Sequence, residues 1–178
     1  MPSRFVCIDF EASGLEPKSF PTEIGLSDPV TGAVWSRLIR PYPVWSAEGE
    51  WNPASEAVTG ISRAMLAADG LDPLSVYTEA LTVIAGRDVV SDSPGFDGKW
   101  FAALVAAAVY GTDGAGEAPP PLQDLIKVAW KLAADRGRRP DIAWQKTELE
   151  ACLRFPMTHR AGPDARHNVE LLRLVAVA

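Results

Sequence analysis

Apolar residues follow two spacings along the chain, and each spacing predicts a different kind of element. Residues 4–10 are mostly apolar, as in a strand covered on both faces, and this run ends in Asp9-Phe10-Glu11. Residues 22–27 and 33–39 are two further strand candidates, separated by a turn that contains Pro29 and Gly32. The first 40 residues therefore predict three consecutive antiparallel strands.

The spacing becomes helical after a Trp-, Pro- and Glu-rich stretch that we interpret as mostly connection, with short helical pieces at 55–58 and 62–67. Residues 73–85 predict a helix capped by Asp72, and its apolar face is expected to carry Leu74, Tyr77, Leu81 and Ile84. A short strand is expected at 88–91, a turn at 93–95, and a helix that Asp97 opens and that runs to about residue 109.

The last third of the chain is predicted to be mainly helical. Residues 111–121 are rich in Gly, Ala and Pro and predict a flexible surface loop. Helical spacing returns at 122–136, 141–153 and 163–177, with Pro163 in the first turn of the last helix. Strands followed by alternating helices and strands indicate an α/β fold.

Composition narrows the protein class. A chain of 178 residues with 47% hydrophobic and 22% charged content fits one globular domain, residues 1–178. We find no apolar run of about 18 residues and no secretory signal at the N-terminus, so we expect a cytoplasmic protein without a membrane partner. Cys7 and Cys152 lack a CxxC spacing and are both expected to be reduced core residues.

Candidate chemistry begins with Asp9 and Glu11. Two residues apart on a strand, their carboxylates point to the same face and can share one cation. An isolated Asp-x-Glu more often caps a turn or pairs with a lysine. Here Ile8 and Phe10 indicate that the segment is buried, and two buried like charges are costly unless a metal or a strong partner neutralises them.

Three segments in order resemble the motifs of the DEDD exonuclease superfamily. Asp9-Phe10-Glu11-Ala12-Ser13-Gly14-Leu15 resembles the first motif, and Pro21-Thr22-Glu23-Ile24-Gly25 is similar to the element that follows it. In Ser91-Asp92-Ser93-Pro94-Gly95-Phe96-Asp97, Asp97 stands where the second motif has its aspartate, with Asp92 as the local competitor. Taken alone, Asp97 would be a first-turn helix acid.

The third segment is the most specific match. His159-Arg160-Ala161-Gly162-Pro163-Asp164 resembles the His-x-Ala-x-x-Asp motif of the histidine-bearing (DEDDh) branch. Without the other segments, His159 would be a surface residue and Asp164 an ordinary first-turn acid. His167, about one helical turn past Asp164, is expected to be a solvated helix residue.

The resemblance implies a ribonuclease H-like α/β fold, with a mixed five-stranded sheet, its first three strands antiparallel, flanked by helices. It implies a 3′–5′ exonuclease that hydrolyses terminal phosphodiester bonds of single-stranded or short DNA or RNA with two Mg²⁺ or Mn²⁺ ions. Asp9, Glu11 and Asp164 would hold one ion, Asp9 would bridge to the second, and Asp97 would support it. His159 would act as the general base, and a homodimer is common among such proteins.

Contacts to the 3′-terminal nucleotide are also implied by the resemblance. In the family, the residues just after the Asp-x-Glu pair contact the terminal nucleotide. The resemblance therefore implies contacts from Ser13, Gly14 and Leu15, with Leu15 against the last base. The family's usual His-Gly-Ile element is Thr59-Gly60-Ile61 here, which departs at its first position and makes Ile61 the remaining candidate. Simple turn packing is the alternative for Leu15.

Charge complicates the expectation of a nucleic-acid partner, because the net charge is −6 and phosphate binding favours basic surfaces. Residues 1–126 hold 7 Lys and Arg against 17 Asp and Glu, whereas residues 127–166 hold 9 against 5. Basic residues of the second region form either a surface that tracks the nucleic-acid backbone or ordinary solvated helix faces: Lys127, Lys131, Arg136, Arg138, Arg139, Arg154, Arg160 and Arg166.

Two rival functions remain open at this stage. One is a catalytically inactive nucleic-acid-binding or scaffold domain of the same fold, which the acidic charge favours and the full set of motif residues disfavours. The other is an endonuclease or integrase-like enzyme that also uses clustered carboxylates. The His159 to Asp164 spacing separates the exonuclease from this second rival.

Overall fold

The computed structural model describes residues 4–109 and 118–177, and its centre is a five-stranded sheet in the order β3-β2-β1-β4-β5. The strands are β1 (Phe5–Ala12), β2 (Pro21–Ser27), β3 (Val34–Leu38), β4 (Asp88–Ser91) and β5 (Leu122–Asp124). The helices of the described residues are α1 (Pro43–Glu48), α2 (Pro53–Thr59), α3 (Arg63–Asp69), α4 (Pro73–Ile84), α5 (Pro94–Val109), α6 (Leu125–Ala134), α7 (Pro140–Arg154) and α8 (Ala161–Val177).

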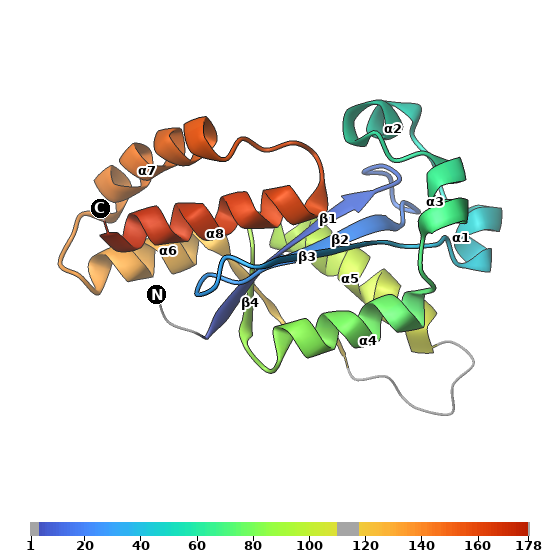
Figure 1. Cartoon of the computed structure of the whole chain (residues 1–178), viewed down its shortest axis with the longest axis horizontal. Helices are drawn as coiled ribbons and strands as arrows, with labels where there is room; N and C mark the ends of the chain where they lie inside the picture. The colour runs from blue at the N-terminus through green and yellow to red at the C-terminus, as the bar shows by residue number, and fades with distance from the viewer. Residues whose placement is uncertain (1–3, 110–117, 178) are drawn as a thin grey trace.

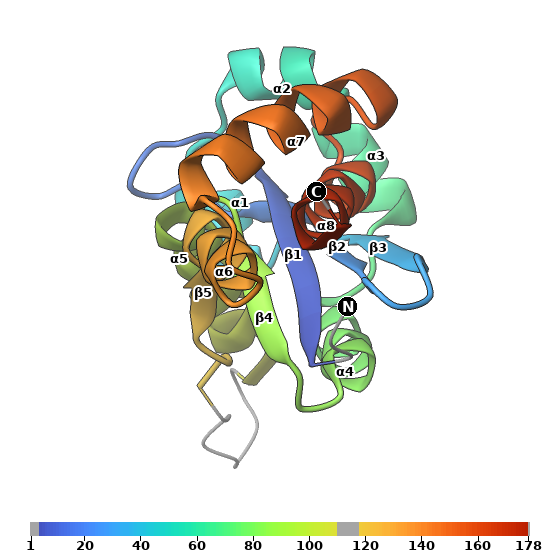
Figure 2. The same cartoon turned by 90° about the vertical axis from the view of Figure 1, so that its left-hand side faces the viewer.

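Strand directions confirm the predicted fold class. β1 pairs antiparallel with β2, β2 pairs antiparallel with β3, and β4 runs parallel to both β1 and β5. Helices α4 and α5 cover one face of the sheet, and α6 and α8 cover the other with α7 outside them (Figures 1 and 2). The result is the expected ribonuclease H-like arrangement, with β1 as the central strand.

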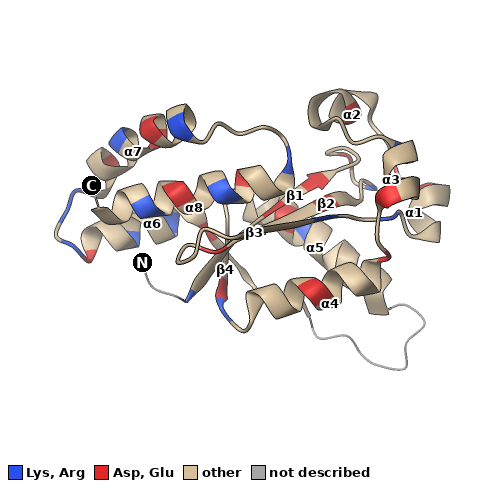
Figure 3. Ribbon diagram, in the orientation of Figure 1, with Lys and Arg blue, Asp and Glu red and all other residues tan. Residues whose placement is uncertain are grey.

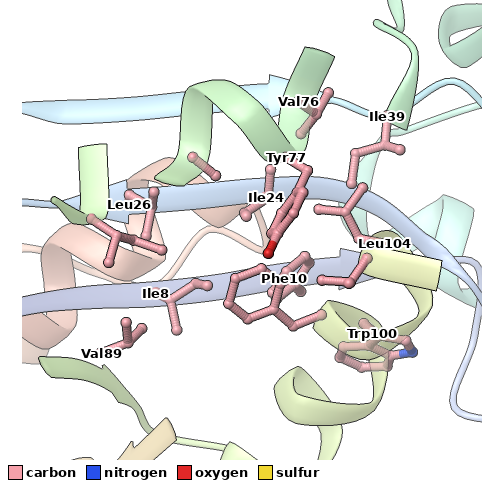
Figure 4. Packing of buried hydrophobic residues seen from close by; sticks show 14 of the residues in the cluster. Ile8, Phe10, Ile24, Leu26, Ile39, Val76, Tyr77, Val89, Trp100 and Leu104 are labelled. Atoms are coloured by element: carbon pink, nitrogen blue, oxygen red, sulfur yellow. The ribbon is translucent and has the colours of Figure 1, made fainter. Parts of the chain in front are cut away.

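Successive side chains of β1 point to opposite faces of the sheet, and only one of these faces carries acids. Val6, Ile8 and Phe10 point toward α4 and α5, where they pack in the larger core cluster around Tyr77 and Leu104 (Figure 4). Phe5 and Cys7 point the other way and pack with residues of α6, α7 and α8. Asp9 and Glu11 continue this second face, because side chains two residues apart share a side of a strand.

A glycine in β2 lets the start of α8 lie directly on the sheet. A Cβ atom built on Gly25 would lie 2.1 Å from the backbone carbonyl carbon of Ala161. Gly25 is also the residue opposite Asp9 in the β1–β2 register. The missing side chain therefore brings the first turn of α8, with Asp164, close to the acids of β1.

Two elements were not predicted, and two helices begin earlier than predicted. Residues 122–124 form β5 rather than the start of a helix, since three residues are too few to show a strand period. α1 lies in the stretch interpreted as connection. α5 begins at Pro94, so that Asp97 lies within its first turn instead of opening it, and α8 begins at Ala161, two residues before Pro163.

The expected apolar face of α4 is partly wrong. Tyr77 and Ile84 are buried as predicted, but Leu74 and Leu81 are 48% and 38% exposed. The core face instead uses Val76 and Ala80, which are fully buried, because the helix turns its smaller residues toward the sheet and α5. Asp72 caps α4 as predicted, accepting a hydrogen bond from the amide of Ser75.

The two cysteines are in different environments. Cys7 is buried in the sheet as predicted, but the prediction that Cys152 is a core residue is wrong, since it lies exposed on α7. The neighbouring residue Ala151 lies on the buried face of that helix instead. Most of the predicted 111–121 loop lies outside the described residues, and 118–121 form neither helix nor strand. No helix among residues 4–109 and 118–177 is long and apolar enough to cross a membrane.

Candidate functional site

Acidic side chains from β1 and α8 meet at the carboxyl-terminal end of β1. Ligand oxygens of Asp9, Glu11 and Asp164 all lie within 4.8 Å of one another. Asp9 and Asp164 are buried, and Glu11 is partly exposed. The fold thus brings together three acids that are up to 155 residues apart in the sequence.

A second acidic group shares Asp9 with the first. Ligand oxygens of Asp9, Asp92 and Asp97 also lie within 4.8 Å of one another. Asp92 follows β4 and is exposed, whereas Asp97 is buried in the first turn of α5. β4 runs parallel to β1 beside it, so both strands end at the same edge of the sheet. Asp9 is therefore the common member of two three-carboxylate groups.

Asp97 is held in place by the end of β4. The Ser91 hydroxyl donates a short hydrogen bond to Asp97 Oδ2, and Ser91 Oγ accepts one from the Ser93 amide at 2.9 Å. Burial raises the pKa of Asp97 to about 7, and the neighbouring charge of Asp92 adds to the rise, while the Ser91 hydrogen bond opposes it. Ser91 is a site residue that the sequence motif did not single out.

Asp164 anchors the segment that enters α8. Its Oδ1 accepts a hydrogen bond from the Thr158 amide at 2.7 Å, and its Oδ2 accepts one from the His159 amide at 3.0 Å. The side chain thus satisfies two amide groups that precede the helix, as an N-terminal acid of a helix often does. Asp164 both belongs to the first acidic group and fixes the backbone that carries His159.

His159 adopts a left-handed backbone conformation with φ of 55°. Such a conformation is costly for a residue with a Cβ atom, so the surrounding hydrogen bonds must hold it. The side chain is exposed and lines a groove of about 550 Å³ together with Glu11. Other residues along this groove are Leu15, Asn52 and Thr59.

Repulsion and burial make two members of the first acidic group, Asp9 and Glu11, hard to ionise. Burial, followed by the charges of Asp164 and Glu23, raises the pKa of Glu11 to about 8, against a lowering by Arg160. Burial, followed by the charges of Asp97 and Glu11, raises the pKa of Asp9 well above its usual value. Carboxylates arranged in this way attract a cation that would neutralise them.

Glu23 and Arg160 form a hydrogen-bonded ion pair beside the first acidic group. Arg160 donates two hydrogen bonds to the buried Glu23, at 2.9 and 2.7 Å, and the Ala161 amide donates a third at 3.0 Å. Glu23 lies opposite Glu11 in the β1–β2 register. Sequence reasoning noted the segment that contains Glu23 but gave it no role. The sequence did contain one sign of such a role, since Glu23 is the only charged residue in the predicted strand 22–27.

The residues implied in substrate contact are unequally exposed. Leu15 is 67% exposed on the rim of the groove, and Gly14 lines it. Ser13 is buried, and its hydroxyl donates to the Glu50 carbonyl at 2.6 Å and accepts from the Phe20 amide at 3.0 Å. Ile61 is 1% exposed and packed inside the protein. Leu15 is thus the exposed member of this set, Gly14 is buried although it lines the groove, and the substrate role of all four residues stays a prediction.

His167 is not the solvated residue that was expected. It is 4% exposed, and its Nδ1 lies 2.6 Å from the Phe155 carbonyl oxygen. The error arises because residues three apart share a helix face, so that His167 follows Asp164 toward the interior. A carbonyl oxygen only accepts hydrogen bonds, so Nδ1 is assigned the hydrogen.

Basic residues of the second region are spread over α6, α7, α8 and their connections (Figure 3). Several are engaged within the protein: Arg154 pairs with Glu150, Arg139 with Asp141, and Lys131 with Asp135. Arg166 stacks over the ring of Phe155. Arg160 is the one of these bases that lies beside the acidic cluster, through Glu23. A surface that tracks nucleic acid stays a prediction for the remaining bases.

Comparisons with known proteins support the fold. No protein-family model matches the chain, and no curated protein sequence matches it. Exonuclease I from Methylocaldum szegediense has a TM-score of 0.67 over 96% of this chain, at 19% identity. E. coli exonuclease I in complex with a dA16 oligonucleotide has a TM-score of 0.66 over 97% of it, at 14% identity. A zinc-bound complex of the E. coli enzyme with single-stranded DNA gives 0.65, also over 97% and at 14% identity.

The chain covers only part of those proteins. It spans 40% of the length of each of the three exonuclease I chains. Identities this low show the fold alone, so that what the chain does must be argued from its own residues.

Proposed function

We propose that the chain is a metal-dependent 3′–5′ exonuclease that removes nucleotides from single-stranded or short nucleic acid. The observation that carries this proposal is the pair of carboxylate groups that share Asp9, placed at one edge of the sheet beside a groove that His159 lines. The fold shared with exonuclease I supports the same function. Solved complexes of that enzyme contain single-stranded DNA and, in one case, zinc.

The donor set fits hard divalent cations. All of the clustered ligand atoms are carboxylate oxygens, which Mg²⁺ and Mn²⁺ prefer, and no cysteine takes part. Asp9, Glu11 and Asp164 would hold one ion, and Asp9 and Asp97 would hold the second. When bound, two such ions supply a deprotonated water and offset charge on the phosphoryl and leaving oxygens.

The protein's own groups would carry the proton and position the strand. His159, exposed at the groove, would accept a proton from the attacking water at an imidazole nitrogen. The water oxygen would then add to the terminal phosphorus, and the bond between phosphorus and the 3′ oxygen of the preceding nucleotide would break, with that oxygen keeping the bonding pair and taking a proton from solvent. The products would be a nucleoside 5′-monophosphate and a strand one nucleotide shorter.

The groove gives the terminal nucleotide a place to bind. Its volume of about 550 Å³ suits a ligand of that size, and Leu15 supplies an exposed apolar surface at the rim. Asp164 would orient His159 through the backbone amide, so that one carboxylate would serve both ion binding and the base. A homodimer is not required by this arrangement, because all of the proposed groups come from one chain.

Linear and circular single strands test the proposal together. Degradation of linear DNA or RNA with Mg²⁺ or Mn²⁺, absent with a chelator and with Asp9→Ala, is the expected result. Circular strands of the same sequence should survive, because they have no end. Cleavage of the circle would indicate an endonuclease, and an inert protein that still binds the strand would indicate a binding domain. Asp69→Asn, an exposed acid at the end of α3, is the matched control.

A further inference from the structure

Asp92 is the one carboxylate in the two acidic groups to which the motif resemblance gives no role. Its oxygens lie within 4.8 Å of ligand oxygens of both Asp9 and Asp97. The residue is exposed, so that an ion arriving from solvent can reach it. It follows β4 directly, where the strand ends beside β1. Asp92 is thus the exposed member of the second group, in which Asp9 and Asp97 are buried.

Asn168 on α8 provides an independent observation that points to this position. The residue is 1% exposed, and its Nδ2 has no hydrogen-bond partner of ordinary geometry among the described residues. Asn168 lies one helical turn past Asp164 on the same buried face of α8, so the amide is directed toward the acidic groups at the end of β1. A buried amide donor that lacks a partner is costly unless a nearby acceptor uses it. Outer groups of this kind orient the carboxylates that bind metals.

We infer that Asp92 is a fifth ligand carboxylate, which completes the second metal site with Asp9 and Asp97, and that Asn168 positions it. The inference rests on the proposed function and adds a residue to its site. Mg²⁺ is usually held by one or two carboxylates together with phosphates of the substrate. Three carboxylates supply enough charge and donors to hold a second Mg²⁺ or Mn²⁺ before nucleic acid binds.

The consequence is a protein that is loaded with two ions in the absence of substrate. Manganese titration of the chelator-treated full chain, without nucleic acid, measures this directly through the electron paramagnetic resonance signal of free Mn²⁺. The wild-type chain should bind two ions. Asp92→Asn should keep the first ion and bind the second more weakly by about 10-fold or more, since loss of even an outer-shell partner costs about 10- to 100-fold. Asp69→Asn should match the wild type.

Three outcomes decide the inference. A wild-type chain that binds one ion, or an Asp92→Asn chain that binds both with wild-type affinity, would overturn it. Loss of the second ion in Asp92→Asn with an unchanged melting temperature would support it, and Asp92→Ser repeats the test if the first variant is unstable. Because binding is measured without turnover, a chain that binds two ions but degrades no strand would refute the proposed function and leave this inference standing.

Discussion

Asp164 Oδ2 accepts a hydrogen bond from the backbone amide of His159 at 3.0 Å, so that a clustered carboxylate sets the position of the candidate base. The same side chain takes the Thr158 amide on its other oxygen. In the proposed function, ion binding and placement of the histidine would therefore be coupled through Asp164, and substitutions at the two positions should have different effects.

Asp164→Asn should lower both activity and stability. The NH₂ group of asparagine would face one of the two backbone N–H groups that now donate to Asp164. That N–H group would lose its acceptor, at a cost of about 1–3 kcal/mol. For a chain of this size each kcal/mol corresponds to about 2–4 °C in melting temperature. Thermal unfolding in the presence of chelator measures the effect without the contribution of bound ions. An unchanged melting temperature would contradict the anchoring role of Asp164.

His159→Gly should lose turnover without losing stability. Glycine adopts the left-handed conformation at no steric cost, which offsets its greater freedom in the unfolded chain. Loss of a general base typically lowers kcat by about 10²–10⁴-fold. Steady-state kinetics, together with manganese binding, should show reduced kcat with both ions retained. Wild-type kcat in this variant would remove His159 from the mechanism.

The chelated protein should become less stable as pH rises from 5.5 to 8. Glu11 and Asp97 have folded pKa values of about 8 and about 7, above the usual values of about 4 in an unfolded chain. In this window the folded state keeps protons that the unfolded state releases, so unfolding is favoured as pH increases. Asp97→Asn should flatten the slope, because asparagine imitates the neutral acid.

Divalent ions should reverse that trend. Mg²⁺ or Mn²⁺ competes with protons for the same carboxylates, so that the melting temperature should rise more at pH 8 than at pH 5.5. Differential scanning fluorimetry at both pH values, with and without chelator, makes the comparison. Equal stabilisation at the two pH values would show that the ions bind outside the acidic cluster.

Gly25→Ala should disrupt the site from a distance. The new Cβ would lie 2.1 Å from the Ala161 backbone. Backbone atoms cannot turn aside as the end of a flexible side chain can, so the clash would remain. The start of α8 would have to move away from β2, taking Asp164 from Asp9, with a large loss of activity and melting temperature. Gly95→Ala is the matched control, because its Cβ meets no atom within 4 Å in the first turn of α5. Equal behaviour of the two variants would contradict the close approach.

The sequence predicted the sheet well because strand signals were strong where side chains are buried. β1 is almost uniformly apolar before its acids, and the turns around Pro29 and Gly32 delimit β2 and β3. β5 was missed because three residues carry no detectable period, and α4 was placed correctly but with the wrong face, since Leu74 looked more suited to a core than Ala80. Local patterns do not reveal which side of a helix meets the sheet.

The candidate site was predictable where a motif carried it and hidden where only folding creates it. The motif resemblance gave Asp9, Glu11, Asp97, His159 and Asp164 as candidates, and the structure brings these acids together. Asp92 appeared only as a competitor of Asp97, although parallel pairing of β4 with β1 places both near Asp9. The burial of His167 and the pairing of Glu23 with Arg160 depend on how α8 packs on β2, which no local pattern records.

The most direct test of the central claim is digestion of one single strand labelled in parallel at its 5′ end and at its 3′ end, with Mg²⁺ or Mn²⁺. The account predicts that the 5′-labelled strand shortens one nucleotide at a time, while the 3′ label is released at once as a mononucleotide, and that both changes are abolished by Asp9→Ala but not by Asp69→Asn. Release of the 5′ label first, cleavage within the strand, or unchanged digestion by Asp9→Ala would contradict it.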